Sequence, residues 1–338
     1  MIVIQSGFRR VGDVLLAPNV VAVRNGIQPF TADTTARLLD GRPFGLCDRI
    51  TWDVELWSLP PEDPPQRYTH AAYNPFGFNF DPHTGWLLFG EPDGDPGRPV
   101  GVKRADGTVV FAPEPDAGIT GFALSPDGER MLCLESWRDM HVFGLPPPPE
   151  RRFVLCTRTT DGGWVRQQTV LRGDEFLSHP AFLPDGERFV ATGSEHRTNS
   201  RRTHEYHVPV QRVFDAHTFA ILETVDAWQH DGPPHFCGHW MATSHSSGVQ
   251  FHDTFDFSRW VSVKSGRRKF AAFAADPAGQ FFLTASGHRV SVWETKTWTE
   301  TKTFAWKAGA ITCLAVAPDG LTAAAGTATG KVVVWDVE

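Results

Sequence analysis

Histidine is concentrated in one part of this sequence, at spacings that are compatible with metal binding. Nine of the 14 histidines fall within residues 196–252. His204-x-x-His207 and His235-x-Cys237-x-His239 separate imidazole and thiol groups by distances that Zn²⁺ accepts. Along a strand and a turn, however, alternate side chains point to opposite faces, and no Cys-x-x-Cys pair accompanies these histidines. We therefore expect no metal, and we name His235 and His239 as the ligands if one binds.

Other motifs that could support chemistry are incomplete. Asp93-Gly94-Asp95 lacks the later bidentate acid of an EF-hand calcium loop. The segment 326–331 is one residue short of a phosphate-binding loop and leads into a strand instead of a helix. No Gly-x-Ser-x-Gly nucleophile motif occurs, and no spacing selects a general acid and base. We expect a non-catalytic protein without a cofactor.

Composition and charge exclude several classes of protein. The formal net charge of −7 argues against general nucleic-acid binding, which needs a basic face. The five cysteines are odd in number and form no disulfide framework, which fits a reducing compartment. The first residues do not resemble a signal peptide, and no apolar run approaches the roughly 18 residues of a membrane span. We therefore expect a cytoplasmic protein that does not bind membranes.

A proline-containing turn recurs between short apolar runs and predicts the architecture. Proline presets φ at the first corner, Asp bonds back to the backbone, and Gly accepts positive φ. An apolar strand on each side makes every copy a hairpin. The clearest copies are Ser125–Gly128, Leu183–Gly186 and Ala317–Gly320, with looser copies at Asp81–Gly85 and Asp276–Gly279.

Several of these hairpins continue into a third apolar run that ends in an aromatic and an acidic residue. Examples are Val290–Glu294 and Val332–Asp336, and a more polar fourth run, Thr297–Phe304, suits an outer edge. Four strands in about 40 to 50 residues is the composition of a propeller blade. Counting a degenerate copy near residue 236 and one at the N-terminus gives seven units. The fold class is therefore all-β, a seven-bladed propeller of four-stranded antiparallel blades.

The chain resembles the WD40-repeat β-propellers over essentially its whole length. The last units match best, and Leu314–Asp336 follows the family pattern closely. The match is degenerate, because Trp306-Lys307 stands where the family has Gly-His and Thr329 replaces the acid before the third strand. The resemblance implies a scaffold that binds protein or peptide partners.

The blade boundaries follow from the spacing of the turns. Residues 1–338 form one propeller domain, and we expect 41–67 to be an insertion. The chain ends after three strands of its last blade, and an unpaired sheet edge is unfavourable. We therefore predict that Met1–Ser6 supplies the missing fourth strand and joins the two ends of the ring. The predicted blades are 11–40, 68–113, 117–158, 178–224, 234–263, 270–304 and 309–338, the last completed by 1–8.

The long insertions are expected to gather on one face of the propeller. If the strands of a blade are named a to d from the axis outward, the b–c and d–a connections leave from the face opposite the Pro-Asp-Gly turns. Four prolines at 146–149 are assigned to a c–d connection instead. Rigid scaffolds carry binding groups on such loops, and Trp and Arg are frequent hot spots. The residues expected to contact a partner are Trp137, Arg138, Arg197, Arg201, Arg202, Trp228 and His230.

One alternative remains open at this stage. Propellers also host hydrolases and lyases whose ligands converge on the central channel. The alternative function is thus a metal-assisted or channel-sited enzyme that uses the histidine-rich segment 196–252.

Overall fold

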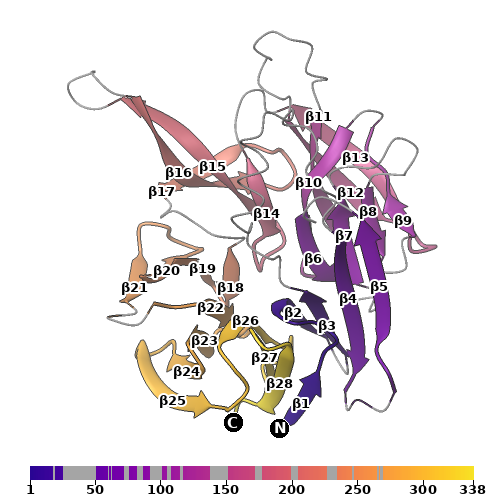
Figure 1. Ribbon diagram of the computed structural model, residues 1–338. Coiled ribbons are helices and arrows are strands. Elements are labelled where there is room, and N and C mark those ends of the chain that lie inside the picture. The colour runs from indigo at the N-terminus through magenta and orange to yellow at the C-terminus, as the bar shows by residue number, and fades with distance from the viewer. Residues whose placement is uncertain are drawn as a thin grey trace, which may run out of the picture.

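The computed structural model is all-β within the residues that it describes (Figure 1). These residues are 1–17, 20–25, 51–59, 61, 63–71, 76–81, 87–91, 101–104, 108–114, 117–137, 151–171, 177–198, 205–226, 234–245, 247–264, 266 and 269–338. Their strands form seven four-stranded antiparallel sheets, which confirms the predicted fold class.

The seven sheets are arranged as blades around a shared centre, which the innermost strands surround in Figure 1. In the first three blades the strands are, from the centre outward, β2 (Val11–Ala17), β3 (Val20–Asn25), β4 (Thr51–Ser58) and β5 (Gln66–Ala71); β6 (Phe76–Phe80), β7 (Leu87–Glu91), β8 (Gly101–Arg104) and β9 (Val109–Phe111); and β10 (Ala117–Leu124), β11 (Arg130–Trp137), β12 (Arg151–Arg158) and β13 (Trp164–Leu171).

The remaining four blades follow the same order. They comprise β14 (Ser178–Phe182), β15 (Arg188–Thr198), β16 (Glu205–Asp215) and β17 (Ile221–Asp226); β18 (His235–Cys237), β19 (Trp240–His245), β20 (Gly248–Asp253) and β21 (Trp260–Lys264); β22 (Ala272–Ala275), β23 (Phe281–Ser286), β24 (Arg289–Glu294) and β25 (Thr299–Ala305); and β26 (Ile311–Val316), β27 (Thr322–Thr327), β28 (Lys331–Asp336) and β1 (Ile2–Gln5).

Two expectations about connections are wrong. Residues 41–67 are not an insertion between blades, because β4 and the whole c–d connection fall within them and β4 pairs with both β3 and β5. In β4, Trp52, Val54 and Leu56 alternate with Asp53 and Glu55, as a strand requires. The second blade accordingly begins at Phe76 instead of residue 68. The prolines at 146–149 lie between β11 and β12, which makes this a b–c connection.

The core consists of apolar side chains packed between neighbouring blades. At the junction of the third and fourth blades, Phe153, Phe189 and Phe214 are fully buried. The rings of Phe189 and Phe214 stack with centroids 4.8 Å apart, and Phe153 meets Phe189 edge-on at 5.0 Å. A thin blade cannot bury both of its faces alone, so these contacts stabilise the ring by joining adjacent blades.

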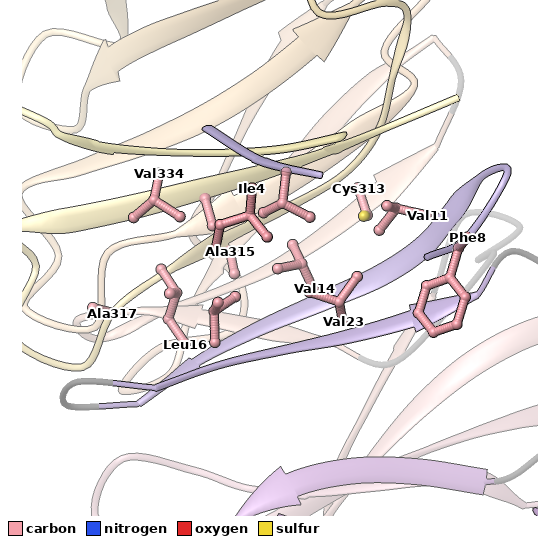
Figure 2. Close-up of a cluster of buried hydrophobic side chains, with 13 residues drawn as sticks. Ile4, Phe8, Val11, Val14, Leu16, Val23, Cys313, Ala315, Ala317 and Val334 are labelled. Carbon is pink, nitrogen blue, oxygen red and sulfur yellow. The ribbon is translucent and has the colours of Figure 1, made fainter. Parts of the chain in front are cut away.

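The ring closes through the N-terminal strand, as the sequence predicts. β1 pairs antiparallel with β28 from Ile2 opposite Val334 to Gln5 opposite Lys331. Beyond the strand, the Ser6 amide and hydroxyl donate to the Gly330 carbonyl at 3.0 and 2.6 Å. Figure 2 shows Ile4 within the apolar cluster that joins the last blade to the first.

A buried carboxylate extends this closure into the first blade. Glu55 on β4 has no exposed side-chain surface and accepts the Gly7 amide at 3.1 and 3.2 Å. It also accepts the Trp57 indole N–H at 3.2 Å and forms an ion pair with Arg67. A buried carboxylate is stable only when such donors surround it. Glu55 therefore anchors the segment that leads from β1 to β2.

Gly330 provides a test of closure. Its φ of +76° disfavours any other residue, and an added Cβ would overlap the Phe8 carbonyl. Gly287 has a φ of +61° but open space around the Cβ position. Gly287→Ala should lower the free energy of unfolding by about 1–2 kcal/mol, which is the cost of placing a residue with a Cβ in a left-handed backbone conformation. Gly330→Ala should lower it by clearly more, because the added Cβ also overlaps the Phe8 carbonyl. Urea unfolding of both variants measures this, and equal losses would contradict the closure geometry.

A second test concerns two tryptophans at equivalent positions. Trp293 donates its indole N–H to the Thr284 hydroxyl at 2.9 Å. In the last blade, the register places Ala325 where Thr284 stands, and the buried indole nitrogen of Trp335 has no partner among the described residues. Ala325→Ser should supply that acceptor and raise the free energy of unfolding by about 1 kcal/mol. Thr284→Val should lower it by about 1–3 kcal/mol. Thermal and urea unfolding measure both, and a destabilised Ala325→Ser variant would refute the pairing.

Candidate interaction faces

The blade topology defines two faces of the propeller. Because successive strands are antiparallel, the a–b and c–d connections leave from one face and the b–c and d–a connections from the other. We call the first the turn face, since it carries the Pro-Asp-Gly turns, and the second the loop face.

The turn face is tied together by contacts from blade to blade. Arg130 donates to the Gly186 carbonyl in the next blade at 2.7 Å, and Arg188 donates to the Thr254 carbonyl at 2.7 Å. Further on, the Gly238 amide donates to the Pro277 carbonyl at 3.2 Å. Because the acceptors are backbone carbonyls held in short turns, these contacts fix neighbouring blades relative to one another.

Another of these ties is a buried ion pair. Arg158 lies 2.6 Å from Asp81 of the preceding blade, and their side chains are only 8% and 5% exposed. Arg158 also donates to the Gly128 carbonyl at 2.9 Å and lies over the Trp164 ring at 4.5 Å. These hydrogen bonds and the cation–π contact offset part of the desolvation of both charges, and the buried Nη1 of Arg158 has no hydrogen-bond partner among the described residues.

The turns themselves satisfy their own polar groups. Ser125 donates its hydroxyl to Asp127, and the Glu129 amide donates to the same carboxylate at 3.0 Å. These hydrogen bonds, that of Ser125 first, lower the pKa of Asp127 below its ordinary value. The carboxylate therefore serves the turn and is not poised as a general base.

The loop face carries the long connections. The longest connection on this face is a b–c connection, which joins β3 to β4. On the turn face, β2 and β3 are separated only by residues 18–19. The other extended b–c connections are residues 92–100, 138–150 and 199–204.

A two-stranded arm projects from the loop face of the fourth blade. β14 pairs with β15 only as far as Thr192, and β17 pairs with β16 only as far as Val210. β15 and β16 continue to pair with each other up to Thr198 opposite Glu205. Figure 1 shows these two strands extending together away from the ring. The sequence predicts a loop here, because the residues are polar, but backbone pairing extends the hairpin.

The structure places two of the predicted partner-binding residues and leaves the others outside the described residues. Trp137 is the last residue of β11, at the loop face. Arg197 lies in the arm, opposite Tyr206. The residues outside the described part are Arg138, Arg201, Arg202, Trp228 and His230.

A buried polar layer lies below the arm, and sequence reasoning missed it. Thr192 pairs with Gln211 in the fourth blade, and Thr243 pairs with Gln250 in the fifth. Strand alternation turns all four toward the cluster of Val190, Val213 and Met241, which joins these blades. Among the described residues, Thr192 Oγ1, Gln211 Nε2 and Gln250 Oε1 are buried without a hydrogen-bond partner. The available signal was a glutamine inside each apolar third strand.

The histidines proposed as alternative metal ligands lie in different surroundings. His235 on β18 packs edge-on against Phe273 with ring centroids 5.3 Å apart. His239 is exposed in the following turn and stacks on Phe255 at 5.9 Å. Within the described residues, no three His, Cys, Asp or Glu side chains gather as they would around a metal ion.

Comparisons with known proteins agree with this architecture. The family model for the WD domain, G-beta repeat, matches residues 298–336. The β-propeller domain of Cps50 (Swd1) from Myceliophteria thermophila has the same fold, with a TM-score of 0.61 over 100% of this chain and 98% of that chain at 13% identity. The comparison with curated proteins finds no significant match.

The fold is that of a β-propeller, and its last blade contains a segment that matches the WD-repeat model. Within the part of the chain that the structure describes, no helix is long and apolar enough to cross a membrane.

His235 makes stability depend on pH. Burial lowers its pKa to about 4. The unfolded chain therefore binds a proton below about pH 6.5, whereas the folded chain binds it only below about 4. The contribution of His235 to the free energy of unfolding is fully present above about pH 6.5. It is lost as the pH falls from about 6.5 to about 4, by up to about 3 kcal/mol. Urea unfolding between these pH values should show that the free energy of unfolding falls less steeply with decreasing pH in His235→Gln than in wild type. His239→Gln is the control, and an unchanged decline in His235→Gln would refute the assignment.

Proposed function

We propose that this protein is a non-catalytic scaffold that binds a protein or peptide partner through its loop face. The observation that carries the proposal is the asymmetry of the two faces. The turn face is built from short connections tied to neighbouring blades, whereas the extended connections and the arm leave from the loop face. A rigid scaffold with variable loops on one face is a common arrangement for recognition.

The arm supports this proposal because of its backbone. Beyond Thr192 and Val210, the described parts of β15 and β16 pair only with each other. Among the residues that the structure describes, each strand therefore keeps one edge of N–H and C=O groups without a strand beside it. Exposed edges of this kind accept an additional strand from a partner, and the backbone hydrogen bonds then supply affinity.

Residue composition on this face adds a second line of support. Tryptophan and arginine supply large contact areas and directional hydrogen bonds, which makes them frequent hot spots. We assign partner contacts to Trp137 and Arg197 on the described strands. The same role is proposed for Arg138, Arg201, Arg202, Trp228 and His230 on the adjoining connections.

We further propose a cytoplasmic location and no general affinity for nucleic acid or membranes. Cys133, Cys156, Cys237 and Cys313 are buried free thiols, as expected in a reducing compartment. The net charge of −7 provides no overall attraction to polyanions.

The arm offers a direct test. Glu195 and Val208 face each other across β15 and β16, so replacing residues 196–207 by Asn-Gly closes the hairpin with a two-residue turn. Because the deleted residues lie beyond the part of the sheet where β14 and β17 pair, the four-stranded blade is retained and the melting temperature should change little. Partner capture from a lysate of the source organism, measured by quantitative mass spectrometry, should fall at least about tenfold.

Two further variants make this experiment decisive. Changing Trp137, Arg138, Arg201 and Arg202 together to Ala should reduce capture of the same partner. Asp256→Asn, in a c–d connection on the turn face, should leave capture unchanged. Capture that survives both loop-face changes, or that depends equally on Asp256, would refute binding through the loop face.

A further inference from the structure

An apolar cleft opens on the turn face, where the last blade meets the first. Its volume is about 380 Å³, within the roughly 300–1,000 Å³ of typical ligand pockets. Four separate parts of the chain line it: the start of β1, the end of β2, Leu59 beyond β4, and the turn and strand ends of the last blade. The cleft therefore exists only because the ring is closed.

The floor of the cleft belongs to the closure core. Leu16, Ala17, Ala317 and Val334 line it, and each is less than a tenth exposed. Figure 2 shows Leu16, Ala317 and Val334 at the end of this cluster away from Phe8. An apolar side chain that entered the cleft would continue the packing of the core and would lose its own contact with water.

The rim of the cleft is acidic. Asp319 and Asp336 line the cleft and are exposed at its edge. Asp319 accepts the Leu321 amide at 2.9 Å, and neither carboxylate forms an ion pair with a cation among the described residues. The α-amino group of Met1, another lining residue, leaves the rim net negative. An apolar floor below two carboxylates is complementary to a segment that carries both an apolar and a basic side chain.

We propose that this cleft is a second docking site, separate from the loop face, for a linear peptide segment in which an aliphatic or aromatic residue adjoins Lys or Arg. The apolar residue fills the cleft between the first and last blades. The cation lies over Asp319 and Asp336. Charge complementarity selects the partner, and apolar burial contributes most of the affinity.

Three fluorescein-labelled peptides test the proposal by fluorescence anisotropy with the purified full chain. The first contains Arg-Leu-Arg-Trp between Gly-Ser flanks, the second replaces both Arg by Glu, and the third replaces Leu and Trp by Gly. We expect the first peptide to bind at least about tenfold more tightly than either of the others. Its affinity should fall as the salt concentration rises, because the rim charges are exposed.

Variants locate the binding site. Asp319→Asn combined with Asp336→Asn removes both rim charges, and Asn at 319 retains an oxygen that can accept the Leu321 amide. This double variant should melt like wild type and bind the first peptide about tenfold more weakly. Asp256→Asn, an exposed acid on the same face of the fifth blade, is the matched control and should bind normally.

The other outcomes overturn the proposal. Equal binding of all three peptides, or no binding of the first, refutes recognition of a basic and apolar segment. Unchanged affinity in the double variant places the interaction elsewhere. A dimer in sedimentation velocity that the double variant dissociates makes a second copy of this chain the occupant. The variant that lacks residues 196–207 retains the cleft, so it should bind the first peptide normally even if it no longer captures the loop-face partner. The two functions are therefore tested separately.

Discussion

Every blade in this protein depends on the pairing of β1 with β28, which makes the sheets a closed ring. A four-stranded blade has two apolar faces, and only neighbouring blades cover them. Without closure, the first and last blades would each expose one such face. The closing hydrogen bond from Ser6 to Gly330 joins residues 324 positions apart, but the entropy of loop closure grows only slowly with length. The free energy gained by burying apolar surface at the seam therefore has to offset only a small additional entropic cost of closing a long chain.

The closure seam differs between its two ends. Toward the loop face it is held by directed polar contacts, in which Glu55 receives the Gly7 amide and Ser6 binds Gly330. Toward the turn face it is held by apolar packing around Leu16 and Val334, and there the cleft opens. Directed contacts fix the backbone in one arrangement, whereas apolar packing accepts an additional side chain of suitable volume. The polar end thus fixes the backbone of the seam, whereas the apolar end contains an open cleft.

The sequence predicts the parts of this structure that follow from local patterns. Pro-Asp-Gly turns between apolar runs indicate the hairpins, and the unpaired last blade indicates that residues 1–6 close the ring. β4 was missed because residues 26–50 separate it from β3 by more than an ordinary connection, although its alternation is clear. Glu55, the Asp81–Arg158 pair and the cleft could not be predicted, because each brings together residues from distant parts of the chain. Such contacts depend on the register of several sheets at once.

The contacts of the turn face also explain why length varies on the other face. Asp127, Asp185 and Asp319 each accept an amide two residues on, which holds each of these three turns in a single shape. Arg130 and Arg188 then reach backbone carbonyls of the next blade that these short connections place within 2.7 Å. An insertion in such a turn would displace the acceptor and leave a partly buried guanidinium without its hydrogen bond. Strands b and c can instead lengthen past the blade, as β15 and β16 do, without disturbing a tie between blades. The contacts of the turns therefore favour variation in length on the loop face.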